Sequence, residues 1–139
     1  MRLHFRRSSD AEAWKRADGR LVSMLELVQR YLRQEFGVYV LTVTSFYRPM
    51  DTGSPHSDYR AVDLRVRDLP AGAAQAVADW INSQFRYSAS PESRYVVCLY
   101  GAYDPNGQHN DHIHLQVPPL SEVVAVRGRP TRSPLPGGS

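Results

Sequence analysis

The chain has 139 residues, of which 42% are hydrophobic and 22% charged, an ordinary composition for one globular domain. Its formal net charge is only +3 and its arginines are scattered, which argues against a nucleic-acid partner. No stretch approaches the ~20 consecutive apolar residues of a membrane span, and residues 1–7 are not followed by the apolar core of a signal peptide. We therefore expect no membrane span and synthesis in the cytoplasm. The lone Cys98 lies in an apolar run and is expected to be a buried, inert thiol.

The first half of the chain predicts one helix and two strands. Apolar residues recur at helical spacing over residues 19–36, and Gly37 follows where a helix C-cap is expected. Residues 38–45 are rich in β-branched side chains and predict a strand, and the turn-forming residues after them predict a loop. Residues 61–67 alternate between apolar and polar side chains, so they predict a strand with one buried side and with Asp63 on its polar side.

The second half predicts another helix and two more strands. Pro70 opens a helix over residues 71–85. The apolar run 94–100 predicts a strand, and a polar turn separates it from an alternating strand over residues 112–117. The polar face of that last strand carries His112, His114 and Gln116.

These elements together predict an α+β fold, with a mostly antiparallel sheet of about four strands and two helices on one face. Residues 1–120 are expected to form the single domain. Residues 121–139 are rich in Pro, Gly and Arg and predict a disordered tail. Within it, the apolar residues 123–126 could add a short edge strand. The sequence does not indicate an oligomeric state, and a monomer is assumed.

Two short stretches contain most of the histidines. One is residues 54–63 (Ser-Pro-His-Ser-Asp-Tyr-Arg-Ala-Val-Asp), and the other is residues 111–114 (Asp-His-Ile-His). A histidine, a carboxylate seven residues later and a distant His-x-His can supply two nitrogens and one oxygen to a zinc ion. A fourth position then stays open for water, as in catalytic zinc sites. Because the histidines and Asp63 lie on the polar faces of their strands, we expect both halves to face one open cleft, on the side of the sheet opposite the helices.

The pattern Ser-x-His-x-x-x-x-Ala-x-Asp, followed by Asp-x-x-His, resembles zinc peptidases that cleave cell-wall peptides containing D-amino acids. These are the D-alanyl-D-alanine carboxypeptidases and dipeptidases and the L-alanyl-D-glutamate endopeptidases of phage lysins. Their wider superfamily includes lysostaphin-type enzymes and the hedgehog signalling domain. The resemblance covers residues 38–117. It implies one zinc ion per chain, held by His56, Asp63 and His114.

The resemblance also implies roles for five neighbouring residues. Asp111 takes the place of the general base, and His112 lies beside the metal without ligating it. Arg48 matches an arginine that contacts the substrate or the developing oxyanion, and Ser54 matches a serine that lines the cleft. The family usually has glycine where this chain has Tyr59, so we expect a different loop there, with Tyr59 lining the substrate pocket. Strict strand alternation turns Asp111 away from the histidine face, so its role requires a bend before residue 112.

The function implied by the resemblance is hydrolysis of peptide bonds in bacterial peptidoglycan stem peptides through a metal-activated water. The sequence leaves open whether the enzyme is a carboxypeptidase or an endopeptidase. With no wall-binding repeat, a phage lysis enzyme fits well, reaching the cell wall by lysis or as part of a virion. One alternative is a catalytically inactive metal-binding module of the same fold, with a structural or binding role. Another is a non-haem iron oxygenase, which usually spaces its first histidine and carboxylate two residues apart instead of seven.

Overall fold

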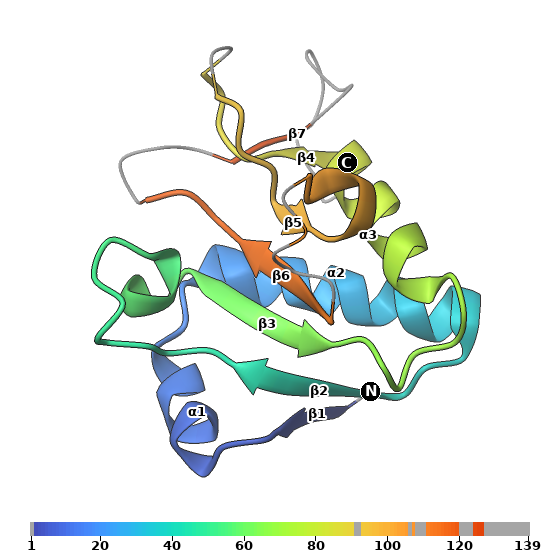
Figure 1. Ribbon diagram of the computed structural model, residues 1–139, viewed down its shortest axis with the longest axis horizontal. Helices are drawn as coiled ribbons and strands as arrows, with labels where there is room; N and C mark the ends of the chain where they lie inside the picture. Colours follow the sequence, from blue (N-terminus) through green and yellow to red (C-terminus); the bar gives the residue numbers. More distant parts are fainter. Residues whose placement is uncertain (1, 91–92, 106, 108–110, 120–123, 127–139) are drawn as a thin grey trace.

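Three helices and a five-stranded sheet form the part of the chain that the structure describes, which is residues 2–90, 93–105, 107, 111–119 and 124–126 of a computed structural model (Figure 1). In chain order the elements are β1 (Arg2–Phe5), α1 (Ser8–Ala13), α2 (Gly19–Phe36), β2 (Val40–Ser45), β3 (Ala61–Arg65), α3 (Ala73–Gln84), β4 (Phe85–Arg86), β5 (Cys98–Leu99), β6 (His112–Gln116) and β7 (Ala125–Val126). Three 3-10 turns are η1 (Trp14–Arg16), η2 (Pro55–Asp58) and η3 (Gly101–Tyr103). None of the helices in these ranges has the length and apolarity needed to cross a lipid bilayer.

The longest helix, α2, occupies the residues that the sequence predicts. The Asp18 side chain caps its first turn by accepting a 2.9 Å hydrogen bond from the backbone N–H of Arg20. Gly37 ends the helix in the left-handed conformation, at φ 67°, which glycine adopts without steric cost. The helix lies behind the sheet in Figure 1 and covers one of its faces. Its side chains in the core are Leu21, Met24, Leu25, Val28 and Leu32.

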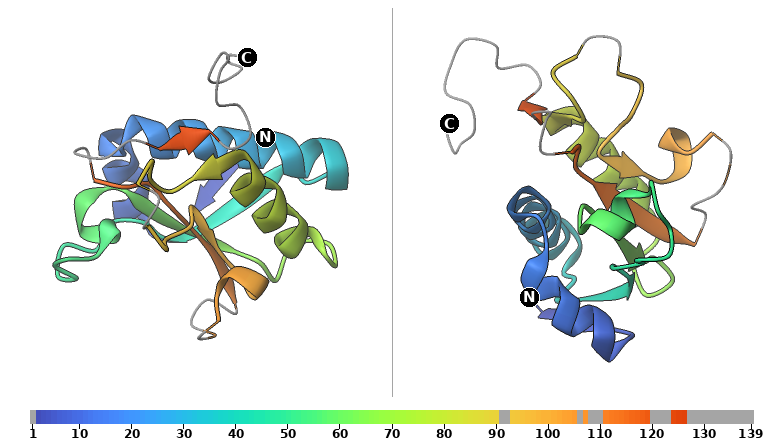
Figure 2. Two further views of the ribbon diagram at one scale, coloured as in Figure 1. Left: turned by 90° about the horizontal axis from the view of Figure 1, so that it is seen from above. Right: turned by 90° about the vertical axis from the view of Figure 1, so that its left-hand side faces the viewer.

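The second predicted helix is confirmed as α3, but it begins two residues later than expected, at Ala73. The reason is Gly72, whose left-handed backbone at φ 82° cannot belong to a right-handed helix. The helix packs against α2 and against β5 (Figure 2). Asn82 joins it to β5 through two hydrogen bonds with the backbone of Cys98, whose C=O accepts from Nδ2 at 2.8 Å and whose N–H donates to Oδ1 at 3.0 Å.

The sheet has the strand order β1-β2-β3-β6-β5 and is mixed, because β1 runs parallel to β2 while the other neighbouring pairs are antiparallel. The prediction of a mostly antiparallel sheet of about four strands is therefore wrong. The unpredicted strand, β1, has four residues that alternate between exposed and half-buried, so it lacks the apolar run that marks a buried strand. Its parallel pairing is possible because α1 and α2 form the long crossover to β2.

The last strands are shorter than the sequence predicts. Of residues 94–100, only β5 pairs with β6, and Tyr95 before it is 70% exposed. The predicted edge strand at residues 123–126 corresponds to β7, which pairs with β4 in a separate two-stranded sheet. Of the predicted disordered tail, residues 121–139, only residues 124–126 lie within the described part of the chain.

Candidate metal centre

Two strands at the centre of the sheet bring the first two candidate ligands together. In the antiparallel pairing of β3 with β6, Asp63 lies directly opposite His114. Directly opposed residues point to the same face of a sheet, so their side chains meet. The Nδ1 atom of His114 lies 2.9 Å from Oδ1 of Asp63. Both side chains are buried, with exposed fractions of 4% for Asp63 and 6% for His114.

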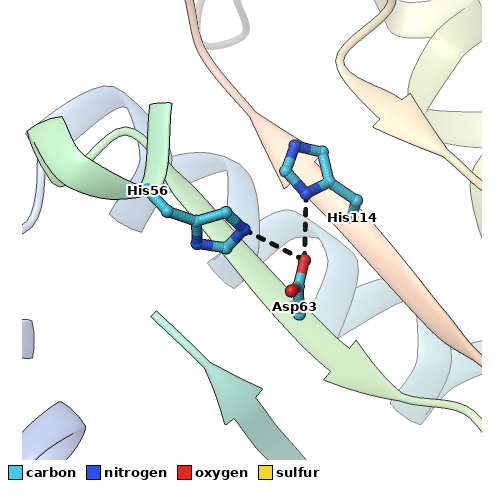
Figure 3. Close-up of side chains that lie close together, drawn as sticks. All are labelled: His56, Asp63 and His114. Atoms are coloured by element: carbon cyan, nitrogen blue, oxygen red, sulfur yellow. Dashed lines mark hydrogen bonds and ion pairs between the residues drawn. The ribbon is translucent and has the colours of Figure 1, made fainter. Parts of the chain in front are cut away.

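The third candidate ligand, His56, comes from the turn η2. The Ser54 hydroxyl caps this turn by accepting a 3.1 Å hydrogen bond from the backbone N–H of His56, and Pro55 favours the first helical position. Nδ1 of His56 lies 2.7 Å from the carbonyl oxygen of Phe46. Because a carbonyl can only accept, Nδ1 carries the proton, and Nε2 is left with its lone pair facing Asp63 Oδ1 at 3.3 Å (Figure 3).

The cluster has the donor set of a metal site. Each of the three residues offers one ligand atom, and these atoms lie within 4.8 Å of one another. Nε2 of His56 is buried and has no hydrogen-bond partner among the described residues. A buried polar atom without a partner is costly, and a cation shared with Asp63 and His114 would supply that partner. The prediction that these three residues come together is confirmed, and the structure shows a group that can hold a metal ion.

The electrostatics of Asp63 suit a cation. Burial on its own raises the pKa of this carboxyl, but its close contacts with the ring nitrogens of His114 and His56 more than offset that effect, so the pKa lies well below its usual range. The carboxylate is therefore negatively charged at neutral pH and available as an oxygen ligand.

The predicted open cleft is not confirmed by the structure. His56 is only 1% exposed, and Asp63 and His114 are buried as well. A cavity of ≈ 350 Å³ lies elsewhere, between the start of α3 and η3, and none of the three clustered residues lines it. Its lining residues are Val66, Leu69, Pro70, Ala71, Gly72, Ala74, Gln75, Tyr100 and Gly101.

The guanidinium of Arg48 reaches the cluster. Its Nη2 atom lies 3.6 Å from Oδ2 of Asp63, whereas both histidines contact Oδ1. Its backbone N–H donates a 3.2 Å hydrogen bond to the carbonyl of His56, which ties the loop after β2 to η2. Nε of Arg48 lies 3.3 Å from Oδ2 of Asp51, an exposed partner.

Asp111 and His112 form a pair next to the cluster. Asp111 lies in a turn immediately before β6, and its side chain is 93% exposed. Its carboxylate Oδ1 lies 2.8 Å from Nδ1 of His112, and Nε2 of His112 lies 3.8 Å from Oδ1 of Asp63. The hydrogen bond from His112 lowers the pKa of the Asp111 carboxyl. His112 thus lies beside the cluster, and Asp111 is connected to it through that ring.

Ser54 and Tyr59 have described contacts that shape the loop. Ser54 caps η2, as stated above. Tyr59 has φ 59° and is the one residue other than glycine with a positive φ in the described part of the chain. Its ring stacks on Tyr47 with centroids 4.3 Å apart and planes 5° apart, and its hydroxyl accepts a 3.5 Å hydrogen bond from Arg16. The left-handed turn is therefore present although the residue is tyrosine.

Two supporting residues were not identified as site residues from the sequence. Asp10, in α1, is 1% exposed and accepts hydrogen bonds from the backbone N–H groups of Phe46 at 3.1 Å and Tyr47 at 3.0 Å. Gln116 lies two residues after His114 and contacts its ring. Gln116 could have been predicted as a site residue, because it lies on the same polar face of β6 as His114. Asp10 could not, because no sequence pattern connects it to backbone groups so distant in the chain.

Comparison with known proteins adds no relative: no protein family, no curated protein and no solved structure matches this chain. The description of the site therefore rests on the structure alone, which is an α+β domain with a buried cluster of two histidines and one carboxylate.

Proposed function

We propose that this chain is a zinc metallopeptidase that hydrolyses peptide bonds in the stem peptides of bacterial peptidoglycan. The observation that carries the proposal is the buried convergence of His56, Asp63 and His114. These are the residues that the motif resemblance assigns to the metal. Further support comes from Arg48 and His112, which the same resemblance assigns to the site and which both lie within 4 Å of Asp63.

Zinc is the metal that best fits this donor set. Two imidazole nitrogens and one carboxylate oxygen are typical of catalytic zinc, which keeps a further position open for water. His56, Asp63 and His114 would hold the zinc ion, and the bound metal would lower the pKa of a water ligand to about 7 and so supply a nucleophile near neutral pH. The fit rests on the buried Nε2 of His56, which has no hydrogen-bond partner among the described residues, and on the close approach of the three ligand atoms.

The Asp111–His112 pair is proposed as the acid–base group. Asp111 takes a proton from the attacking water, directly or through the His112 ring, and the pair returns it to the leaving amine. The 2.8 Å contact between Asp111 and His112 favours the route through the ring, because Nε2 of His112 is the end that faces the cluster.

Arg48 is proposed to bind the substrate beside the metal. Its guanidinium either polarises the scissile carbonyl or holds a terminal carboxylate in a two-pronged contact. The first action suits an endopeptidase, and the second suits a D,D-carboxypeptidase. Ser54 and Tyr59 flank the ligand His56 and are proposed to contact the peptide in a cleft on the cluster side of the sheet. A phage lysis enzyme that reaches the wall at lysis or within a virion is the setting we favour.

The test is incubation of the zinc-loaded protein with purified peptidoglycan, followed by mass spectrometry of the released fragments. Asp111→Ala removes the proposed base, and Asp63→Ala removes a proposed ligand. The exposed Glu26, on α2, gives a carboxylate control as Glu26→Ala. We expect defined fragments from the wild type and from the control alone, and the new termini would identify the bond. Equal release by the wild type and Asp111→Ala would contradict the proposal.

A metal-binding module without turnover is the second candidate. The observation that favours it is the burial of all three candidate ligands, since a structural ion needs no access for a peptide. Stoichiometric zinc binding with no fragment release by the wild type would establish this alternative. Iron in place of zinc in the purified protein would instead support the oxygenase reading.

A further inference from the structure

We infer that Gln116 is a positioning residue that fixes the orientation and tautomer of His114, so that Nδ1 of this histidine faces the metal. The inference rests on the proposed metal site and extends it to a residue outside the ligand set.

The contacts of Gln116 define which end of its amide meets the histidine. Gln116 and His114 are two residues apart on β6, so their side chains lie on the same face. Nε2 of Gln116 donates a 2.9 Å hydrogen bond to the carbonyl of Val96. Its Oε1 is consequently the atom that faces Nε2 of His114, at 2.9 Å. The backbone N–H of Gln116 also donates to the carbonyl of Val97, at 2.9 Å, which holds the residue against the neighbouring chain segment.

This arrangement specifies the histidine tautomer. An amide oxygen only accepts hydrogen bonds, so Nε2 of His114 is the protonated nitrogen in the neutral ring. Nδ1 then carries the lone pair and faces Oδ1 of Asp63 at 2.9 Å. Two electron-rich atoms at that separation need a shared positive centre between them, and a cation provides it. Histidine ligands commonly donate their second N–H to a carbonyl or carboxylate for this reason.

The two histidines present different ring nitrogens to Asp63. His56 donates a hydrogen bond from Nδ1–H to the Phe46 carbonyl and presents Nε2 to Asp63, whereas His114 donates from Nε2–H to Gln116 and presents Nδ1. Each lone pair faces the same oxygen of Asp63. The orientation of His56 depends on a backbone carbonyl, which no side-chain substitution removes. Gln116 is therefore the position at which the orientation of a histidine ligand can be tested by substitution.

Zinc affinity is the first readout, measured by competition with a chelator of known affinity. Gln116→Met keeps the length of the side chain and removes the acceptor, and we expect zinc to bind about 10- to 100-fold more weakly. Gln116→Glu keeps an oxygen acceptor for Nε2–H, and we expect it to restore affinity to within several-fold of wild type. Asn82→Leu is the matched control, because Asn82 is also a buried amide, and its hydrogen bonds with the backbone of Cys98 tie a helix to β5. It should lower thermal stability and leave the zinc affinity unchanged.

The tautomer itself is the second readout, from long-range ¹H–¹⁵N NMR spectra of the zinc-loaded protein. We expect a protonated Nε2 and a metal-bound Nδ1 for His114 in the wild type and in Gln116→Glu. Equal zinc affinity in wild type and Gln116→Met, or no rescue by Gln116→Glu, would overturn the inference while leaving the metal site intact. Absence of zinc binding by the wild type would overturn the proposed metal site and this inference together. Normal zinc binding with the expected variant effects, but no peptide hydrolysis, would support the inference and contradict only the peptidase.

Discussion

Substitution of Asp10 tests how the first ten residues support the metal centre. Its carboxylate accepts hydrogen bonds from the buried N–H of Phe46 and the half-buried N–H of Tyr47, and from the guanidinium of Arg7. Asp10→Ala leaves both backbone donors without this partner. Because an unsatisfied buried donor costs about 1–3 kcal/mol, we expect the free energy of unfolding to fall by about 2–4 kcal/mol. For a domain of this size the Tm then falls by roughly 10 °C.

The loss of Asp10 should also reach the candidate metal ligands. The N–H of Phe46 donates a hydrogen bond to Asp10, and the carbonyl of Phe46 accepts one from His56. A shift of this one residue therefore turns the His56 ring. We expect Asp10→Ala to weaken zinc binding in protein that is still folded, as judged by calorimetric titration well below the lowered Tm.

Arg7→Ala is the control for this prediction. Arg7 pairs with the same carboxylate, but its side chain is 45% exposed and returns to water when the pair is absent. We expect a loss of about 1 kcal/mol or less from this substitution. If urea denaturation gives equal losses for Arg7→Ala and Asp10→Ala, the backbone hydrogen bonds are not the source of the stability and the reasoning is refuted.

Three further predictions follow from individual side chains. Arg20 lowers the pKa of Asp18, so this carboxylate stabilises the fold above its ordinary pKa of about 4 and the contribution disappears as the pH falls through the lowered value. Urea denaturation should therefore give a wild-type advantage over Asp18→Asn at pH 7 that shrinks as the pH is lowered below about 4; a gap that stays constant would contradict this prediction. At residue 59, Tyr59→Gly should be more stable than Tyr59→Ala by about 1 kcal/mol, because both lose the ring but only glycine relieves the left-handed backbone; a more stable alanine variant would refute the strain. Burial raises the pKa of the Cys98 thiol to about 12, so a disulfide reagent should label it only after unfolding, and rapid native labelling would count against its burial.

The sequence predicted the elements whose residues repeat with a regular period. Residues 19–36 gave a helix with its ends in place, because the apolar side and the capping glycine are both local signals. The strand β1 gave no such signal, since its four residues are stabilised by pairing with β2 and not by an apolar run. Its parallel direction depends on the path of α2, which no local pattern specifies.

The ligand cluster was predictable because its members belong to two motifs on adjacent strands. The surroundings of the cluster were not predictable from the sequence. The burial of His56 depends on how η2 packs over the sheet, and the sequence alone gave an open cleft that the structure does not confirm. Asp10 acts on backbone groups 36 and 37 residues away, and such a contact leaves no trace in residue spacing. The identity of the metal and the reaction stay predictions.

The direct opposition of Asp63 and His114 connects metal capture to the progress of folding. A slip of β6 by one residue against β3 would turn His114 to the opposite face of the sheet. The two residues are 51 positions apart, so their pairing closes a long loop, a step that is slow in folding. A metal ion held by this pair would therefore bind only after the central strands have aligned. In a refolding experiment, the time at which metal binding appears would report when β3 and β6 have aligned correctly.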